Sequence, residues 1–231
     1  MNISQVMALA PMTPAQAAQF VRYYELLAEW NAKFNLTAIT DEAGVLARHF
    51  ADSLSVLPAL PPSAKMLLDV GTGAGFPGIP IKIMRPELDV TLMDSTQKKL
   101  GFCDEVTCAL GLAGIRTAHA RAEEAAHDAR HRERYDAVVA RAVAAMPTLA
   151  EYLLPFVKVG GVCIAMKGSD AKEEAAQAGA AISTLGGKLA RVDEVTLANL
   201  PDKRALIVID KIAPSPPIYP RQGGRPRSNP L

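Results

Sequence analysis

The feature that most constrains the fold of this 231-residue chain is an apolar run that leads into a cluster of glycines, LLDVGTGAGFPG at 67–78. Glycines at the end of a strand let the backbone turn sharply and approach a ligand that side chains would keep away. The segment therefore predicts a strand, a ligand-binding turn and a helix, which is the first unit of a parallel α/β sheet. A tight strand–helix turn that binds nothing is the alternative.

The glycines fit two cofactor motifs. Gly73, Gly75 and Gly78 satisfy the G-x-G-x-x-G pattern of dinucleotide-binding enzymes. Gly71, Gly73 and Gly75, preceded by Asp69, instead match the D-x-G-x-G-x-G loop typical of proteins that bind S-adenosylmethionine. A carboxylate beside the loop suits a cofactor that carries an ammonium and a sulfonium, and is a poor neighbour for a pyrophosphate. Asp69 therefore favours S-adenosylmethionine.

Short apolar runs alternate with helix-length segments after Lys65. The expected strands are 66–70, 90–93, 116–118, 137–140 and 162–166, and the clearest helices between them are 97–110, 146–157 and 171–185. This alternation predicts a parallel sheet with helices on both faces. Two more runs, 190–197 and 205–210, are joined too closely for a helix and should be antiparallel neighbours. The layout resembles the Rossmann-like seven-stranded sheet of S-adenosylmethionine-dependent methyltransferases.

The α/β domain covers residues 63–213, and the regions on either side of it differ from it in composition. Residues 1–62 predict an N-terminal helical cap packed on the core, with a capping box at 13–16 and a second helix from 41 to the prolines near 58. The apolar face of the first helix is assigned to Phe20, Tyr24, Leu27, Trp30 and Phe34. Residues 214–231 contain six prolines and three arginines, which predicts a basic, loosely structured tail.

Composition restricts the class of protein. Hydrophobic residues make up 49% of the chain and charged residues 21%, as in a soluble globular protein, and no apolar run approaches the roughly 18 residues of a membrane span. No signal sequence is recognisable, and three cysteines without a CxxC pair favour a reducing cytoplasm. His127 and His131 lie in a charged stretch, so no metal site is expected. We expect a cytoplasmic monomer that does not contact membranes.

Residues after later strands are further candidates for the ligand site. Asp94 lies 23 residues after Gly71, where an acid can accept both ribose hydroxyl hydrogens. Glu123 follows the third strand, where it contacts adenine or is a solvated acid at a helix start. Arg141 ends the fourth strand, so it should project into the cleft unless it forms a structural salt bridge.

These motifs together resemble one family over essentially the whole chain. The matching residues are Trp30-Asn31, Asn35-Leu36-Thr37, Arg48-His49, Asp52-Ser53-Leu54, 69–80, Asp94-Ser95, Lys98-Lys99, Arg121-Ala122-Glu123, Arg141-Ala142, Lys167-Gly168, Tyr219-Pro220-Arg221, Gly224, Pro226 and Pro230-Leu231. They are similar to the bacterial 16S ribosomal RNA guanine-N7 methyltransferases, the glucose-inhibited division protein B family. The resemblance implies S-adenosylmethionine as cofactor, held by residues that include Gly71, Gly73, Gly75, Phe76, Asp94, Ala122, Glu123 and Arg141.

The resemblance also implies a substrate, 16S ribosomal RNA or the small ribosomal subunit. Guanine N7 carries a lone pair and no hydrogen, so no general base is required and catalysis depends on proximity and orientation. Arg141 is a candidate methyl-site residue because the methylated guanine is cationic. The base should be reached in a single-stranded or loop region, since N7 lies in a deep groove of A-form RNA.

Candidate RNA contacts are cations and one histidine: Arg48, His49, Lys98, Lys99, Lys167, Arg221, Arg225 and Arg227. Ordinary solvated charge is the alternative for each cation, and a surface ion-pair cluster is the alternative for Arg48 and His49 with Asp52. Two other functions stay open at this point. One is a nicotinamide-dependent oxidoreductase, and the other is a non-catalytic RNA-binding module that retains the cofactor pocket.

Overall fold

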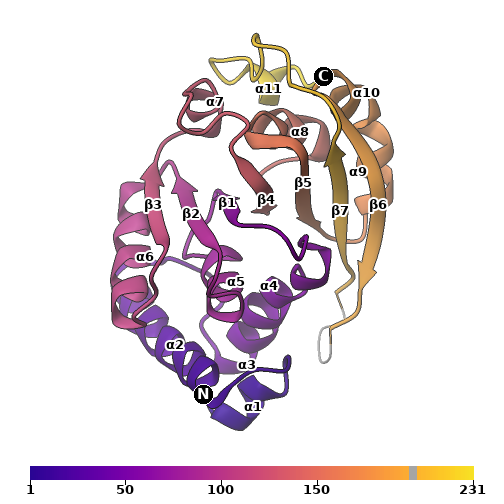
Figure 1. Ribbon diagram of the computed structural model, residues 1–231. Helices are drawn as coiled ribbons and strands as arrows, with labels where there is room; N and C mark the ends of the chain where they lie inside the picture. Colours follow the sequence, from indigo (N-terminus) through magenta and orange to yellow (C-terminus); the bar gives the residue numbers. More distant parts are fainter. Residues whose placement is uncertain (198–201) are drawn as a thin grey trace.

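The computed structural model describes residues 1–197 and 202–231, and its centre is a seven-stranded sheet in the order β3-β2-β1-β4-β5-β7-β6 (Figure 1). The strands are β1 (Met66–Val70), β2 (Asp89–Asp94), β3 (Ile115–His119), β4 (Tyr135–Arg141), β5 (Val157–Lys167), β6 (Gly187–Val195) and β7 (Arg204–Lys211). β1 to β5 are parallel, and β7 pairs antiparallel with both β5 and β6. The predicted fold class is confirmed.

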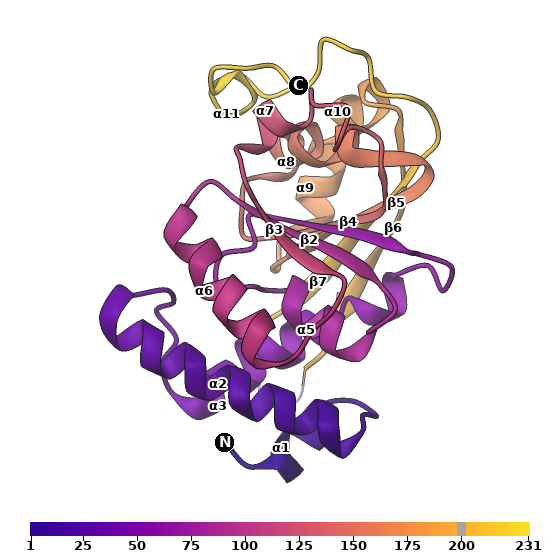
Figure 2. The same ribbon diagram turned by 60° about the vertical axis from the view of Figure 1, so that its left-hand side comes forward.

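Helices cover both faces of the sheet, because successive strand residues point to opposite sides. One core contains Leu67 and Val139 with residues of α1 (Ile3–Met7), α2 (Pro14–Phe34), η1 (Val45–Ala51), α4 (Asp52–Leu54), η2 (Leu57–Ala59), α5 (Gly78–Met84) and α6 (Gln97–Ala109). The short α3 (Glu42–Gly44) leads into η1 and has no buried residue. The other contains Leu68 and Val138 with α7 (Ala122–Ala125), α8 (Met146–Leu153), η3 (Leu154–Phe156), α9 (Ala171–Gln177) and α10 (Gly179–Thr184). The two layers are visible in Figure 2.

The N-terminal helices share their core with the sheet instead of forming a separate one. Thr13 caps α2 through the predicted capping box with Gln16. The buried face of α2 is turned relative to the prediction: Tyr23 is fully buried, whereas Tyr24 is half-buried and Phe34 is 38% exposed. Tyr23 is favoured inside because its hydroxyl donates a hydrogen bond to the carbonyl of Ala74, in the glycine loop.

Several predicted boundaries are wrong by a few residues. The helix expected over 171–185 is two helices, since the backbone leaves helical geometry at Ala178. The helix expected over 146–157 ends at Leu153, because η3 follows and Val157 already begins β5. The expected close connection between the last two strands falls partly on residues 198–201, which lie outside the described residues.

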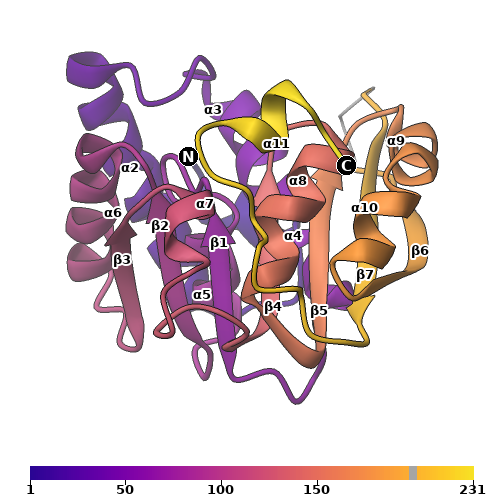
Figure 3. The same cartoon turned by 90° about the horizontal axis from the view of Figure 1, so that it is seen from above.

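The tail is not loosely structured, which corrects the prediction. It crosses the α8 face of the sheet and ends in α11 (Arg225–Ser228) (Figure 3). Arg132 donates hydrogen bonds to the carbonyls of Ser215, Pro216 and Tyr219 at 2.8–3.1 Å. A proline-rich backbone lacks N–H donors but keeps its carbonyl acceptors, so an arginine with five donors can order it.

Candidate functional site

The glycine loop begins where β1 ends and is held by β2. The amide of Gly71 donates to the carbonyl of Met93 at 2.8 Å, and that of Gly73 donates to Oδ2 of Asp94 at 3.0 Å. Gly71 has φ +71°, and a Cβ there would lie 2.7 Å from Cγ2 of Val143. Both the backbone angle and this close approach require glycine at position 71.

Asp69 shapes the loop from beneath it and does not line the cleft. Its Oδ2 accepts hydrogen bonds from Oγ1 of Thr72 at 2.6 Å and from the amide of Gly78 at 2.8 Å. The carboxyl is completely buried, and this burial raises its pKa to about 6. The expectation that Asp69 faces a cationic cofactor is therefore replaced by a structural role.

A cleft of about 340 Å³ opens beside this loop, at the carboxyl ends of β1, β2 and β3. We call it the glycine-loop cleft. Its lining includes the predicted cofactor residues Gly71, Asp94, Ala122 and Glu123, together with Val70, Met93, Ser95, Thr96, Lys99, Ala120, Arg121, Val143, Ala144, Tyr152 and Arg227. Four residues chosen from sequence therefore meet around one cavity.

Asp94 can serve both the loop and a ligand. Its two oxygens accept one backbone hydrogen bond each, Oδ2 from Gly73 and Oδ1 from Thr96 at 2.8 Å. An ionised carboxylate has about four acceptor positions, so two remain for ligand hydroxyls. Asp94 is 7% exposed and lines this cleft.

Four of the predicted cofactor residues do not line the glycine-loop cleft. Gly73 and Gly75 shape the loop, and a Cβ at Gly75 would lie 2.7 Å from the hydroxyl of Tyr23. Phe76 is buried in a stack, with ring centroids 5.2 Å from Tyr23 and 4.4 Å from His49. Arg141, the fourth, contacts this stack, with its guanidinium 5.2 Å from the Phe76 ring centroid.

A second cavity, of about 470 Å³, lies at the ends of β4 and β5, and we call it the rim pocket. It is lined by Ile39, Arg48, His49, Asp52, Arg141, Ala142, Met166, Lys167, Gly168 and Arg204. Arg141 donates to Oδ2 of Asp52 and to the carbonyl of Arg48, both at 2.9 Å. Arg48 itself pairs with Asp202 at 3.6 Å, so Arg48, His49 and Asp52 form no ion-pair cluster among themselves, although all three line this pocket.

His49 is held neutral in the rim pocket. Arg141 can only donate, so Nδ1 of His49 accepts its hydrogen bond at 3.2 Å. Nε2 therefore carries the ring proton and donates to Oγ1 of Thr37 at 2.9 Å. Burial, assisted by the charge of Arg141, lowers the pKa of His49 to about 4.

The predicted RNA-contacting cations fall into three groups. Lys167 and Arg221 are paired, with Glu174 and Glu151 respectively, each at 2.7 Å. Lys99 and Arg227 line the glycine-loop cleft, and Arg48 lines the rim pocket. Lys98 lies 3.8 Å from the centroid of the Phe34 ring and Arg225 is exposed in α11, so both present their charge to solvent.

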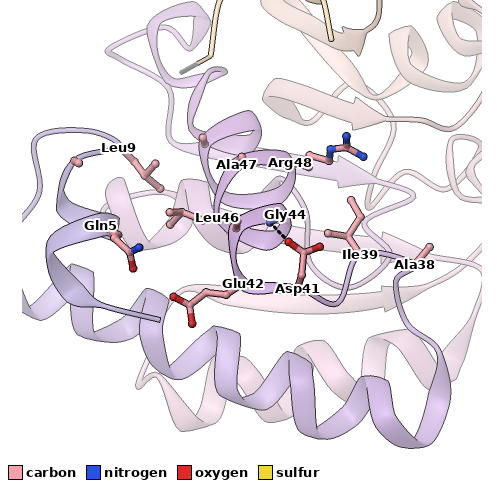
Figure 4. A pocket seen from close by; sticks show the side chains of 13 residues that line it. Gln5, Leu9, Ala38, Ile39, Asp41, Glu42, Gly44, Leu46, Ala47 and Arg48 are labelled. Carbon is pink, nitrogen blue, oxygen red and sulfur yellow. Dashed lines mark hydrogen bonds between the residues drawn. The ribbon is translucent and has the colours of Figure 1, made fainter. Parts of the chain in front are cut away.

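The most voluminous of the described cavities, about 820 Å³, lies elsewhere, between α1 and the run from α3 to η1 (Figure 4). Its two carboxylates are already engaged. Asp41 accepts from the amide of Gly44 at 2.7 Å, and Glu42 pairs with the N-terminal ammonium at 2.6 Å. It shares no residue with the glycine-loop cleft, so volume alone does not identify the ligand site.

Sequence reasoning missed Tyr152 and Arg204 as lining residues and named Arg227 only as an RNA contact. Tyr152 and Arg227 reach the glycine-loop cleft from α8 and the tail, and Arg204 lies 3.4 Å from Asp52. No local motif marks them, because each is brought to the site by the order of the strands. Within 1–197 and 202–231, no three His, Cys, Asp or Glu side chains are placed to hold a metal ion, and no helix is long and apolar enough to span a membrane.

The sheet order and the cleft beside the glycine loop define a Rossmann-like methyltransferase fold. Solved structures agree: an S-adenosylmethionine-dependent methyltransferase from Aquifex aeolicus has a TM-score of 0.57 at 16% identity, covering 77% of this chain and 97% of that one. The crystal structure of TrmN from Thermus thermophilus has a TM-score of 0.52 at 21% identity, covering 72% and 53%.

Sequence relatives identify the family. The family model described as rRNA small subunit methyltransferase G matches residues 16–205. Proteins named ribosomal RNA small subunit methyltransferase G are 50% identical in Acetivibrio thermocellus, over 94% of this chain and 89% of that one, and 48% identical in Lactobacillus johnsonii, over 94% and 92%. The chain belongs to the rRNA small subunit methyltransferase G family, which excludes the nicotinamide-dependent oxidoreductase.

Proposed function

We propose that this protein transfers a methyl group from S-adenosylmethionine to N7 of a guanine in 16S ribosomal RNA. The observation that carries the proposal is the convergence of Gly71, Asp94, Ala122 and Glu123 on one cleft, in a chain of this family. The helical cap 1–62, the methyltransferase domain 63–213 and the basic tail 214–231 act together as a cytoplasmic monomer. The partner is the RNA itself or the small ribosomal subunit.

The residues of the glycine-loop cleft fit the cofactor. The free acceptor positions of Asp94 suit ribose hydroxyls, and Ala122 and Glu123, at the start of α7, suit an adenine edge. Gly71 keeps the backbone open where the methionine portion would lie. When bound, S-adenosylmethionine supplies an electrophilic methyl group.

The rim pocket is the proposed place of the target base. The lone pair of guanine N7 attacks without proton removal, so the residues here orient the base and exclude water. Asp52 lies beside Arg141, which offsets the positive charge near the base. Neutral His49 adds no charge of its own, so a cationic methylated guanine is tolerated.

The RNA backbone is held by the cations that remain exposed, Arg48, Lys98 and Arg225, with Lys99 at the cleft. Lys167 and Arg221 are left out of this surface, since each is paired with a carboxylate and only 10% and 21% exposed. We include His49 as a contact to the base rather than to phosphate.

The test is transfer of a labelled methyl group to small subunits, or to purified 16S RNA, from cells that lack the modification. The product is identified by digestion and mass spectrometry. Label recovered as 7-methylguanosine supports the proposal. Cofactor binding without label in RNA would refute the substrate and favour a non-catalytic RNA-binding module, and absence of cofactor binding would refute the cofactor.

A pair of glycine variants adds a matched control. Gly71→Ala should abolish transfer. The backbone of residue 71 has φ +71°, which strains an alanine, and the new Cβ would lie 2.7 Å from Cγ2 of Val143. Gly111→Ala carries a similar backbone cost at φ +63° but meets nothing within 4 Å. Equal loss of activity in both variants would mean that backbone strain, and not the cleft, explains the effect.

A further inference from the structure

The C-terminal tail reaches the glycine-loop cleft. Arg227, in α11, lines this cleft with Gly71, Asp94 and Glu123, although it lies more than 100 residues after them in the chain. Figures 1 and 2 both show α11 beside α7 and α8, which carry other lining residues. An exposed arginine from a proline-rich tail is thus part of a cavity wall.

Buried polar contacts with α8 fix this position. The guanidinium of Arg221 binds Glu151 at 2.7 Å, and that carboxylate has no exposed surface. Oγ1 of Thr148 donates to the carbonyl of the buried Pro226 at 2.8 Å. Pro226 immediately precedes Arg227 and Glu151 immediately precedes Tyr152, so the same contacts bring both cleft residues into place.

We propose that the tail is a fixed wall of the cofactor cleft, and that Arg227 binds the adenosine portion of S-adenosylmethionine. The inference rests on the proposed function, because it takes that cofactor as the ligand of the glycine-loop cleft. It assigns Arg227 to the cofactor, while Arg225 in the same helix faces solvent and remains a contact for RNA.

The charges of the cofactor favour the adenosine end. Its sulfonium and ammonium would repel a guanidinium at the methionine end, whereas adenine is neutral and planar and can stack on a planar guanidinium. Arg227 also lies near the acidic side of the cleft. Burial raises the pKa of the Tyr152 phenol, and the negative charge of Glu123 raises it further. The positive charge of Arg227 lowers this pKa, so the three side chains lie within electrostatic reach of one another.

The experiment measures binding of three probes to the full-length protein without RNA, by titration calorimetry: S-adenosylmethionine, S-adenosylhomocysteine and 5′-methylthioadenosine. The variants are Arg227→Ala, Arg227→Lys and the matched control Arg225→Ala, whose side chain is also exposed but does not line the cleft. Thermal melts of each variant check that the fold is retained. Filter binding of a 16S RNA fragment measures RNA affinity in parallel.

We expect Arg227→Ala to weaken all three probes by about fivefold, since loss of a stacked guanidinium costs this much. Arg227→Lys keeps the charge but not the planar group and should be similarly weakened, while Arg225→Ala should lower RNA affinity only. Unchanged probe affinity in Arg227→Ala, with weaker RNA binding, would overturn the inference and assign Arg227 to RNA. If the wild-type protein binds none of the probes, the proposed function itself fails along with the inference.

Discussion

Two buried or nearly buried charges contribute differently to this site, the carboxyl of Asp69 and the ion pair of Arg141 with Asp52. Asp69 is a buried carboxylate that anchors the glycine loop, and its Oδ1 has no hydrogen-bond partner among the described residues. Arg141 and Asp52 neutralise each other at the rim pocket with side chains 18% and 6% exposed. Both arrangements place charge away from water, so each has a measurable effect on stability.

The titration of Asp69 predicts a pH effect on folding. Burial raises the pKa of this carboxyl from 3.8 to about 6, so between these values the folded protein holds a proton that the unfolded chain has released. Stability therefore falls as pH rises through this range. Relative to wild type, the free energy of unfolding of Asp69→Asn should increase by about 2 kcal/mol between pH 4 and pH 7.

Denaturant unfolding at several pH values measures this difference. Asp210→Asn removes one carboxylate from an exposed position on β7 and serves as the control. A difference between Asp69→Asn and wild type that does not vary with pH would contradict the assignment of the buried proton to Asp69.

Arg141 and Asp52 should be energetically coupled. Arg141→Ala removes the closest cation from a nearly buried carboxylate, which should lower the free energy of unfolding by about 3 kcal/mol and abolish methyl transfer. Adding Asp52→Asn should restore part of the stability, because the unpaired charge is then gone. A double-mutant cycle measures the coupling, and additive effects within about 0.5 kcal/mol would show that the pair is not coupled.

At the level of elements, the tail and α8 behave as one unit. α8 contributes Thr148 and Glu151 to the tail contact and Tyr152 to the cleft. The tail in return satisfies the charge of Glu151. A segment that composition alone marks as loose is therefore ordered by partners elsewhere in the chain.

Loss of the ion pair between Arg221 and Glu151, which fixes the tail on α8, should lower the stability of the protein. Arg221→Ala leaves the fully buried Glu151 without its cation, so we expect the free energy of unfolding to fall by about 3 kcal/mol. Arg225→Ala, in the same tail but exposed, should change it by less than about 0.5 kcal/mol. Thermal melts and proteolysis of the tail measure both, and equal stability of the two variants would contradict the anchoring role.

On the scale of the whole molecule, both candidate ligand cavities lie at the carboxyl edge of the sheet. The glycine-loop cleft lies over β1, β2 and β3, and the rim pocket lies over β4 and β5. The segment from Ala142 to Ala144 lies between them, since Ala142 lines the rim pocket and Val143 and Ala144 line the cleft. Cofactor and base would therefore approach one edge from neighbouring cavities.

RNA binding should depend steeply on salt, although the net charge is only +1. Exposed cations near this edge release counterions when they meet phosphates, and about four contacts predict a log–log slope near −3. Arg225→Ala should reduce the slope by about 1, whereas Lys188→Ala, at the opposite edge of the sheet, should not change it. Filter binding across a salt series measures the slope, and an RNA affinity that does not change with salt concentration would contradict the proposed RNA-binding surface.

Prediction from sequence succeeded where signals are local. The cap at Thr13 and the glycine turn after β1 depend on residues a few positions away, and the structure has both. Asp94 ends β2 as the sequence indicated, but its contact with the amide of Gly73 is made across 21 residues. Prediction was weaker for Phe76 and Arg141, which face the rim-pocket side, and for the tail. Those positions depend on side chains distant in sequence, such as His49 and Asp52.

By itself, the sequence determined the class of fold, the family and the strand ends that carry the candidate cofactor residues, because alternating apolar runs and glycine turns restrict the backbone locally. The tertiary structure alone decided that Asp69 is buried, that Arg141 pairs with Asp52 and that Arg227 enters the cleft. The physical reason is that burial and ion pairing arise from contacts between residues far apart in the chain, 89 positions for Arg141 and Asp52 and more than 100 for Arg227 and Glu123, which exist only after the sheet has assembled.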